Sequence, residues 1–399
     1  MRPRARRCGR AGSSDAVDLA FSPAEEAFRS ALRAWLAANV PRDRPEPATL
    51  AEEVAALRAW QRRLHEGGWV GIHWPREYGG RGATVVENYI FQEELAAARA
   101  PEIINRIGVN LVGPTLIAHG TEAQKRRFLP KILPAEELWC QLFSEPGAGS
   151  DLTALRTRAE RVADGWVVSG QKVWTSYAQF ARWGILLART DPTAPKAKGI
   201  SYFICDMQAP GVTVRPLRQM TGSEEFNEVF LDQVHIPREH LVGTENAGWA
   251  IANTTLAHER GTAPRQLVIH RMLFADLLRL ARERGAGADP VLRQRLAQHW
   301  IELEITRLNN WRTLTRLLRR EPLGPEASFV KLFWSEMSQR MHDTLMQLLG
   351  PHGLCWQDAR LGRLVRSYLY YRSATIFAGT SEIQRNILAE RVLGLPRGR

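Results

Sequence analysis

The sequence predicts an α+β protein of several domains: a helical N-terminal domain, a small β domain (a small barrel) and a C-terminal four-helix bundle. Three observations predict this order. Helix-start signals recur in the first third, short runs rich in β-branched and aromatic residues follow between about 138 and 241, and helical periodicity returns from Gly248 onward. At 399 residues the chain exceeds the size at which one core stops growing, so two or three domains are expected.

The N-terminal helices are predicted from their caps. Ser22-Pro23-Ala24-Glu25 has the spacing of a capping box, with proline at the first helical position. The same spacing recurs at Thr49 and Glu52 and at Thr121 and Gln124, each time before a helical pattern. We therefore place a helical domain at residues 18–137.

The middle of the chain reads as strands separated by turns. Expected strands include Trp166–Val168, Val173–Ser176, Gly184–Leu187, Ile200–Cys205 and Val229–Leu231. This gives a β domain at 138–243 and leaves 244–399 for the helical bundle. Within that bundle we expect a helix at Gly248–Arg271 and breaks near 285–290 and 322–325.

Charge and cysteine usage limit the function classes. The formal net charge is +12, and five arginines in the first ten residues supply much of it, so we expect residues 1–17 to be a disordered basic leader. The remaining arginines suit an acidic ligand such as a CoA nucleotide, and nucleic acid is not expected as a partner. Cys8, Cys140, Cys205 and Cys355 lack metal-ligand spacing, which predicts free thiols, no metal site and a cytoplasmic location. No apolar run is long enough for a membrane span.

Five motifs stand in a fixed order along the chain. They are Gly71–Gly80, Phe143–Asp151, Gly170–Ser176, Gln347–Gly353 and the run Ile376–Arg385. In that order they resemble the flavin-dependent acyl-CoA dehydrogenase family, and the resemblance extends from about residue 21 to the end. It implies the acyl-CoA dehydrogenase fold, an FAD cofactor held without a covalent bond, and an acyl-CoA substrate.

The resemblance also implies roles for individual residues. The glycines at 147 and 149 let backbone N–H groups approach a cofactor that larger side chains would exclude. The expected FAD contacts are Gln141, Phe143, Ser144, Gly149, Ser150, Trp174, Thr175, Ser176, Gln347, Gly350, Thr380 and Glu382. The expected substrate contacts are Ser150, His258, Arg260 and Gly379.

Ala378 departs from the family pattern. Most members have a glutamate before the Gly-Thr pair, and that carboxylate removes the Cα proton of the thioester. Alanine cannot accept a proton, but its backbone N–H can still polarise the thioester carbonyl. A minority of members carry the base on another helix, at the position matching Glu259, so Glu259 is the expected base here.

Two more departures concern the far end of the cofactor. The segment Ala281–Gly287 lacks the Arg-x-x-Phe-Gly motif of the family, and Pro351 and His352 replace small residues. By resemblance both segments contact the FAD adenosine and pyrophosphate across a subunit interface, so looser FAD retention is expected. Such departures are similar to those of actinobacterial dehydrogenases that act on bulky acyl-CoAs, including sterol side chains.

The leading hypothesis is FAD-dependent α,β-desaturation of an acyl-CoA thioester, with hydride transfer from Cβ to flavin N5. Two alternatives stay open: a non-catalytic or half-site subunit of a hetero-oligomeric dehydrogenase, and a DNA-binding or oxidase/monooxygenase flavoprotein on the same fold. The expected electron acceptor is an electron-transfer flavoprotein or a similar protein. Helical bundles of this kind associate further, so we expect a homotetramer or a heterotetramer with a related dehydrogenase chain.

Overall fold

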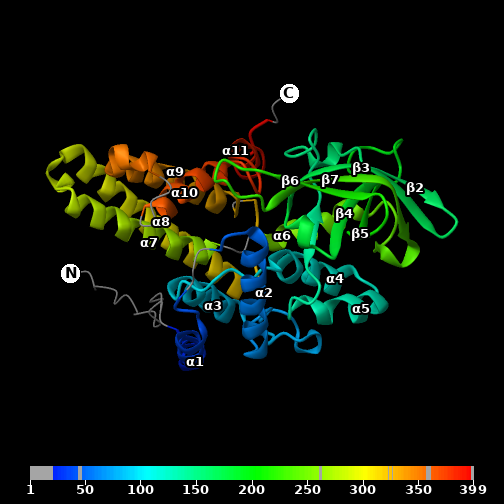
Figure 1. The fold of residues 1–399 in the computed structure, drawn as a ribbon, viewed down its shortest axis with the longest axis horizontal. Coiled ribbons are helices and arrows are strands. Elements are labelled where there is room, and N and C mark those ends of the chain that lie inside the picture. Colours follow the sequence, from blue (N-terminus) through cyan, green and yellow to red (C-terminus); the bar gives the residue numbers. More distant parts are fainter. Residues whose placement is uncertain are drawn as a thin grey trace, which may run out of the picture.

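The structure is a computed structural model that describes residues 21–43, 47–259, 263–321, 323–325, 327–355 and 361–396. The side chains of residues 257–259 and 263 are not part of that description. The basic leader predicted at 1–17 therefore lies outside the described residues, as does Cys8. The described chain forms helices, then a β-sheet, then helices, as Figure 1 shows.

The N-terminal helices begin where the caps predict. The Ser22 hydroxyl accepts the Glu25 N–H, and the Glu25 carboxylate accepts the Ser22 N–H. Thr121 and Gln124 make the same reciprocal pair, while Thr49 accepts the Glu52 N–H. The helices are α1 (Pro23–Asn39), α2 (Leu50–Glu66), α3 (Val85–Ala97), α4 (Gly113–His119) and α5 (Glu122–Ile132).

The β domain is one eight-stranded sheet. Its strands pair in the order β6-β7-β3-β2-β4-β5-β8, and β1 adds parallel to β4. Two of the predicted strands, at 166–168 and 173–176, are parts of one long strand that is bulged near its end. The strands are β1 (Trp139–Leu142), β2 (Arg158–Val162), β3 (Gly165–Ser176), β4 (Trp183–Arg189), β5 (Ile200–Asp206), β6 (Val212–Leu217), β7 (Phe226–Pro237) and β8 (Leu241–Val242).

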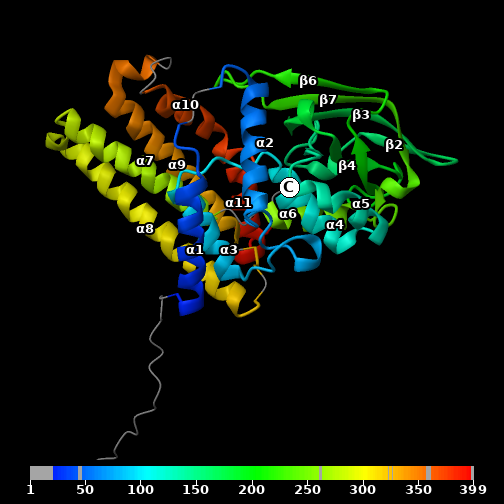
Figure 2. The same cartoon turned by 60° about the horizontal axis from the view of Figure 1, so that its bottom comes forward.

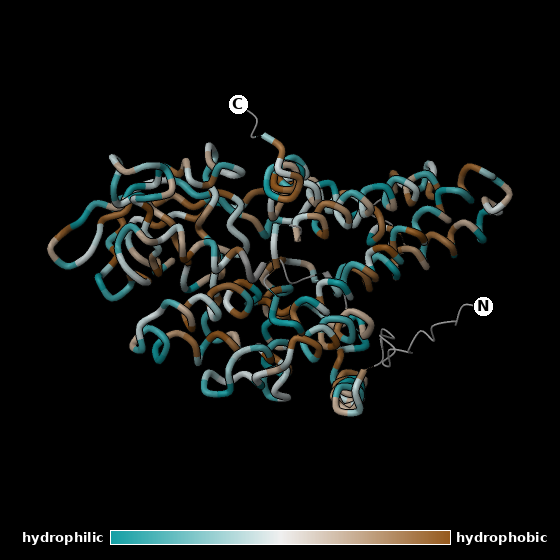
Figure 3. The backbone as a smooth tube through the Cα atoms, turned by 180° about the vertical axis from the view of Figure 1, so that it is seen from behind, coloured by the Kyte–Doolittle hydropathy of each residue, from teal (hydrophilic) through white to brown (hydrophobic). Residues whose placement is uncertain are grey.

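The C-terminal helices form a bundle with its own core. Leu277, Leu303, Met337, Met341 and Leu345 are among its fully buried side chains. Figure 3 shows hydrophobic positions recurring along these helices. The helices are α6 (Gly248–Glu259), α7 (Ala263–Glu283), α8 (Pro290–Leu318), α9 (Ala327–Leu349), α10 (Gly362–Tyr371) and α11 (Ser381–Ile387).

Helix α6 packs apart from this bundle core. Its buried residues Ile251 and Ala252 share a hydrophobic core with the N-terminal helices and with the β4 and β5 side chains Ile185 and Tyr202. The turned view in Figure 2 places α6 beside α4 and the sheet. The described residues of the helix expected at Gly248–Arg271 are helical, in α6 and in the first part of α7, and residues 260–262 lie outside the described part.

Several other expectations can be compared with the described residues. The bundle breaks fall as predicted, because Asp289 caps the start of α8 and α8 ends before residues 322–325. Cys140, Cys205 and Cys355 are free thiols, and no group of His, Cys, Asp and Glu with metal-binding arrangement is found in the described part of the chain. Among the described helices, none is long and apolar enough to cross a membrane.

Candidate functional site

The first segment predicted to bind the flavin is Phe143–Asp151, which follows β1. Gln141 lies on that strand, and Phe143 directly after it is buried edge-on against Tyr202, with 5.9 Å between the ring centroids. The chain then turns, and Gly149 and Ser150 are exposed. A Cβ atom placed at Gly147 or Gly149 would meet nothing within 4 Å, so the space beside this turn is open to a ligand.

The second flavin segment is Gly170–Ser176, the end of β3, and it lies against the first segment. The Val173 N–H donates to the Ser144 carbonyl at 2.9 Å, which joins the two segments directly before Trp174. Trp174 adopts a left-handed backbone with φ of +59°, and its side chain is 60% exposed. A large indole on the surface beside an open turn is the arrangement expected of a residue that covers a planar cofactor.

The three residues of this segment do not share one face. Thr175 is fully buried, and its carbonyl accepts the Asn227 amide at 3.0 Å, whereas Ser176 is partly exposed like Trp174. Successive strand residues point to opposite sides, so the Thr175 side chain lies inside the domain. A cofactor over this segment would meet Trp174 and Ser176 by their side chains and Thr175 by its backbone only.

The loop between α10 and α11 contains the start of the Ile376–Arg385 motif, and we call it the signature loop. Its backbone is constrained. Ala378 has φ of +52° and Gly379 has φ of +90°, both in the left-handed region. The buried Gln384 donates its side-chain amide to the Ala378 carbonyl at 3.2 Å and to the Gly379 carbonyl at 3.4 Å. Ala378 is exposed, and its own N–H has no partner among the described residues. The backbone donor expected at this position is therefore free to bind a ligand oxygen.

The residues around this loop have mixed roles. The Thr380 hydroxyl caps α11 by accepting the Ile383 N–H at 3.2 Å. Glu382 lies exposed in the first turn of that helix, and hydrogen bonds from its own backbone N–H and from the Thr380 hydroxyl lower its pKa. Behind the loop, the Phe377 ring packs against Trp334 of α9, with centroids 6.2 Å apart.

Buried hydroxyls join helix α6 to α4 and to Tyr202 of β5, which contacts the first flavin segment. The Thr255 hydroxyl lies 2.8 Å from that of Thr115 on α4 and 3.2 Å from that of Tyr202, whose ring contacts Phe143. Position 259 is one helical turn beyond Thr255, at the end of α6. The side chains of His258 and Glu259 and the whole of Arg260 lie outside the description, so their geometry is not part of this site.

The two segments expected at the far end of the cofactor do come together. A cavity of about 520 Å³ lies between them and is lined by Arg284, Arg295, Gln347 and Asp289 among others. Arg284 donates to the Leu349 carbonyl at 2.9 Å, and Arg295 contacts the Gln347 side chain. Gly350 follows with φ of +54°, a conformation that favours glycine. Two guanidinium groups beside the one carboxylate of Asp289 leave this hollow with a net positive charge, which suits an anionic group such as a pyrophosphate.

Four residues of this arrangement had no predicted role. Glu145, Lys172 and Gln384 stand inside the predicted motifs, and Arg295 belongs to no motif. A charged residue at an inward position of a strand, as Lys172 is, could have signalled a buried partner. Arg295 gave no such signal, because its neighbourhood is made by another helix.

Comparison with known proteins agrees with this arrangement. Family models match residues 22–136 (acyl-CoA dehydrogenase, N-terminal domain), 140–234 (middle domain) and 246–393 (C-terminal domain). Acyl-CoA dehydrogenase IpdE1 of Mycobacterium tuberculosis is 42% identical over 93% of this chain and 98% of its own length.

Two solved structures match nearly the whole chain. The steroid ACAD Tcur3481-Tcur3483 has a TM-score of 0.84 and 32% identity, covering 96% of this chain and 100% of that one. The ChsE4-ChsE5 complex from Mycobacterium tuberculosis has a TM-score of 0.81 and 31% identity, with the same coverage. The fold and these matches define a flavin-dependent oxidoreductase. The chain belongs to the acyl-CoA dehydrogenase family, whose members bind FAD.

Proposed function

We propose that this chain is an acyl-CoA dehydrogenase that desaturates the α,β bond of a thioester, with Glu259 as the base and the Ala378 N–H as a donor to the thioester carbonyl. The observation that carries the proposal is the signature loop. Its left-handed backbone is held by Gln384, and the Ala378 N–H has no partner among the described residues, although the carboxylate usual at this position is absent.

The proposed reaction divides the work between two parts of the chain. A hydrogen bond from the Ala378 N–H to the thioester oxygen stabilises the negative charge that develops when Cα loses its proton. The Glu259 carboxylate takes that proton, which requires a base within hydrogen-bonding reach and with a suitable pKa. Bound FAD supplies the acceptor for the hydride that leaves Cβ. Trp174 and Ser176 would hold the flavin ring over the open turn at Gly149 and Ser150.

We further propose that the acyl group is bulky. The support is the similarity to relatives that include a steroid ACAD and IpdE1. Ser150, His258, Arg260 and Gly379 are the proposed contacts of the substrate, and Gln141, Phe143, Ser144, Thr380, Glu382, Gln347 and Gly350 remain proposed contacts of FAD. An electron-transfer flavoprotein or a similar protein is the proposed electron acceptor.

The test of the base is a pair of substitutions read out by flavin bleaching with acyl-CoAs under anaerobic conditions. We expect Glu259→Gln to keep fold, FAD and acyl-CoA binding and to slow bleaching by ~10²–10⁴-fold, the range for loss of a general base. Ala378→Glu in that background places a carboxylate where most relatives have theirs and should restore part of the rate. Full bleaching by Glu259→Gln alone would contradict the assignment.

A second candidate function is one half of a shared site in an assembly of two related chains. The absence of a carboxylate at 378 favours it, together with the similarity to the ChsE4-ChsE5 complex. It predicts that the isolated chain binds little FAD and that co-expression with a related dehydrogenase chain restores FAD and activity. If the chain by itself bleaches with an acyl-CoA, this second function is wrong.

A further inference from the structure

A fully buried lysine lies directly beside both flavin segments. Lys172 of β3 has no exposed surface, and its Nζ donates to the Glu145 carboxylate at 2.9 Å and to the Phe143 carbonyl at 3.1 Å. Phe143 begins the first segment, and Trp174 of the second lies two residues after Lys172. The Lys172 ammonium group therefore binds the first flavin segment, although Lys172 itself belongs to β3, which carries the second.

The partner carboxylate extends this contact to a third place in the chain. Glu145 accepts the Arg156 N–H at 2.7 Å and the Thr157 N–H at 2.9 Å, just before and at the approach to β2. Its backbone also makes two hydrogen bonds of 3.0 Å with Ala148, which close the turn before Gly149. The Glu145 side chain is thus tied at both oxygens, and the turn that carries the glycines cannot move without breaking these bonds.

The energetics of this pair indicate a role beyond filling the core. Burial of the ammonium lowers the pKa of Lys172 to about 8, although the attraction of Glu145 opposes the shift. Burial alone would raise the pKa of Glu145, but Lys172 and the N–H donors hold it below its ordinary value. Buried ion pairs add little net stability over apolar side chains of the same volume, because both charges lose their hydration. What the pair adds is direction, since the Lys172 ammonium and the Glu145 carboxylate hold three backbone groups in place: the Phe143 carbonyl and the N–H groups of Arg156 and Thr157.

We propose that Lys172 and Glu145 are positioning residues for the cofactor: they lock the Phe143–Ser150 turn against the Trp174–Ser176 strand end and so set the affinity and surroundings of the flavin ring. The Val173 N–H bond to the Ser144 carbonyl completes the lock. Neither side chain needs to touch FAD. The inference rests on FAD binding and is independent of which residue is the base, so Glu259→Gln and the variants below fail or succeed separately.

The experiment uses the full chain, purified with its partner chain if it assembles with one. The variants are Lys172→Met, Glu145→Gln and the double variant, and Val168→Ala is the matched control. Val168 lies on the same strand and is fully buried, but it belongs to a different hydrophobic core from Phe143 and Ala148 of the turn. The measurements are the FAD dissociation constant of the apoprotein by flavin fluorescence, the visible absorption and circular dichroism of bound FAD, thermal melting, and hydrogen exchange of the 143–150 amides.

We expect each single variant to weaken FAD binding by at least ~10-fold, as for loss of a charged hydrogen bond, and to change the visible dichroism of the bound flavin. The double variant should lose less than the product of the two single effects, because it leaves no unpaired charge. Exchange of the 143–150 amides should speed up in apo Lys172→Met, and Val168→Ala should lower the melting temperature with FAD affinity unchanged.

Two results would overturn the proposal. One is a folded double variant that binds FAD with the affinity and spectrum of the original chain. The other is a Val168→Ala protein whose FAD affinity falls as much as that of Lys172→Met at an equal loss of melting temperature. The loss of affinity would then follow from lower stability of the domain and not from the lost ion pair. If the single variants do not fold, the double variant, which buries no charge, takes the place of Lys172→Met in this comparison.

Discussion

Ala378 shows how a substitution can remove one function of a position and leave another. The left-handed backbone at φ of +52° and the two carbonyls bound by Gln384 do not depend on the side chain at 378. The free N–H is also a backbone property. A carboxylate, by contrast, exists only in the side chain. In the proposed function, replacement by alanine therefore separates carbonyl polarisation, which the backbone N–H can still provide, from proton abstraction, which we assign to another residue.

Two buried histidines behind the signature loop make a prediction about acid stability. His270 and His342 are buried, both contact the Tyr371 ring, and burial lowers the pKa of each from 6.5 to about 4. Each stays neutral in the fold but takes a proton in the unfolded chain below pH 6.5. The unfolded state thus binds more protons between about pH 6.5 and 4, so stability is lost as the pH falls through that window.

We expect the free energy of unfolding to drop by at most about 3 kcal/mol per histidine across this window, from 1.36 kcal/mol per unit of pKa difference. Urea denaturation at a series of pH values with saturating FAD measures it. His270→Phe and His342→Gln should each flatten the acid limb. His235→Gln is the control, because His235 is largely exposed and pairs with exposed Asp164. An unchanged slope in the double variant of His270 and His342 would contradict the prediction.

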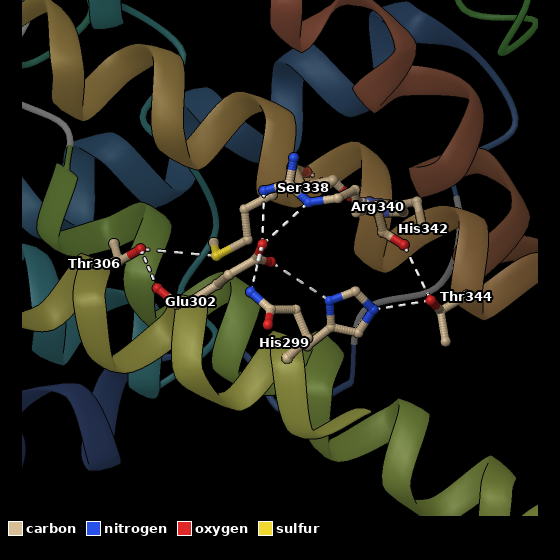
Figure 4. A network of polar contacts seen from close by, with 9 residues as sticks. His299, Glu302, Thr306, Ser338, Arg340, His342 and Thr344 are labelled. Carbon is tan, nitrogen blue, oxygen red and sulfur yellow. Dashed lines mark hydrogen bonds and ion pairs between the residues drawn. The ribbon is translucent and has the colours of Figure 1, made fainter. Parts of the chain in front are cut away.

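At the scale of elements, the bundle is joined by polar contacts as well as by its apolar core. Figure 4 shows His299, Glu302 and Thr306 of α8 facing Arg340 and Thr344 of α9. Glu302 is 5% exposed and accepts two bonds from Arg340, at 3.1 and 2.8 Å. His299 lies 2.8 Å from the Thr344 hydroxyl. This network fixes the register of α8 against α9, since a shift by one residue would bury these charges without partners.

Removing either partner should destabilise the bundle, and removing both should cost less than the sum. We expect Glu302→Gln to lower the free energy of unfolding by about 1–2 kcal/mol, less than for a fully buried pair because Arg340 is half exposed. Arg340→Met should cost at least as much, since it leaves a buried carboxylate. Urea denaturation of the double-mutant cycle measures the coupling energy. Strictly additive losses would show that the contact between Glu302 and Arg340 does not stabilise the fold.

At the scale of the molecule, α8 has a second apolar face that the described residues leave exposed. Ile301 and Leu308 are each 50% exposed and lie seven residues apart, so they share one side of the helix, away from the buried Leu296 and Leu303. Exposed apolar side chains in such a row mark protein interfaces. The prediction of an oligomer built through the C-terminal helices therefore has a definite surface.

Leu308→Glu should weaken this assembly, because it places a charge in the middle of the apolar face. We expect a smaller species by light scattering at micromolar concentration, with unchanged far-ultraviolet circular dichroism. Arg312→Glu on the exposed surface of the same helix, one turn beyond Leu308, is a control for charge without loss of apolar area. An original chain that is already monomeric at this concentration, alone and with a related chain, would contradict the interface.

The sequence by itself determined the features that depend on local interactions. The helix starts at Ser22 and Thr121, the change from helix to strand and back, and the motif order that identifies the family all follow from neighbouring residues. Cap hydrogen bonds and the alternation of apolar and polar residues span three or four positions, so they can be recognised in the sequence. The loss of the carboxylate at 378 is legible in the same way, because it is a matter of residue identity at a motif position.

Only the tertiary structure decided which residues share one place. The contact of Lys172 with Glu145 and Phe143 joins residues 27 and 29 positions apart, and that of Arg284 with the Leu349 carbonyl spans 65. It also turned Thr175 inward and assigned α6 to the core of the first two domains. Such facts depend on which faces are buried together, and burial is a property of the packed chain and not of any local segment.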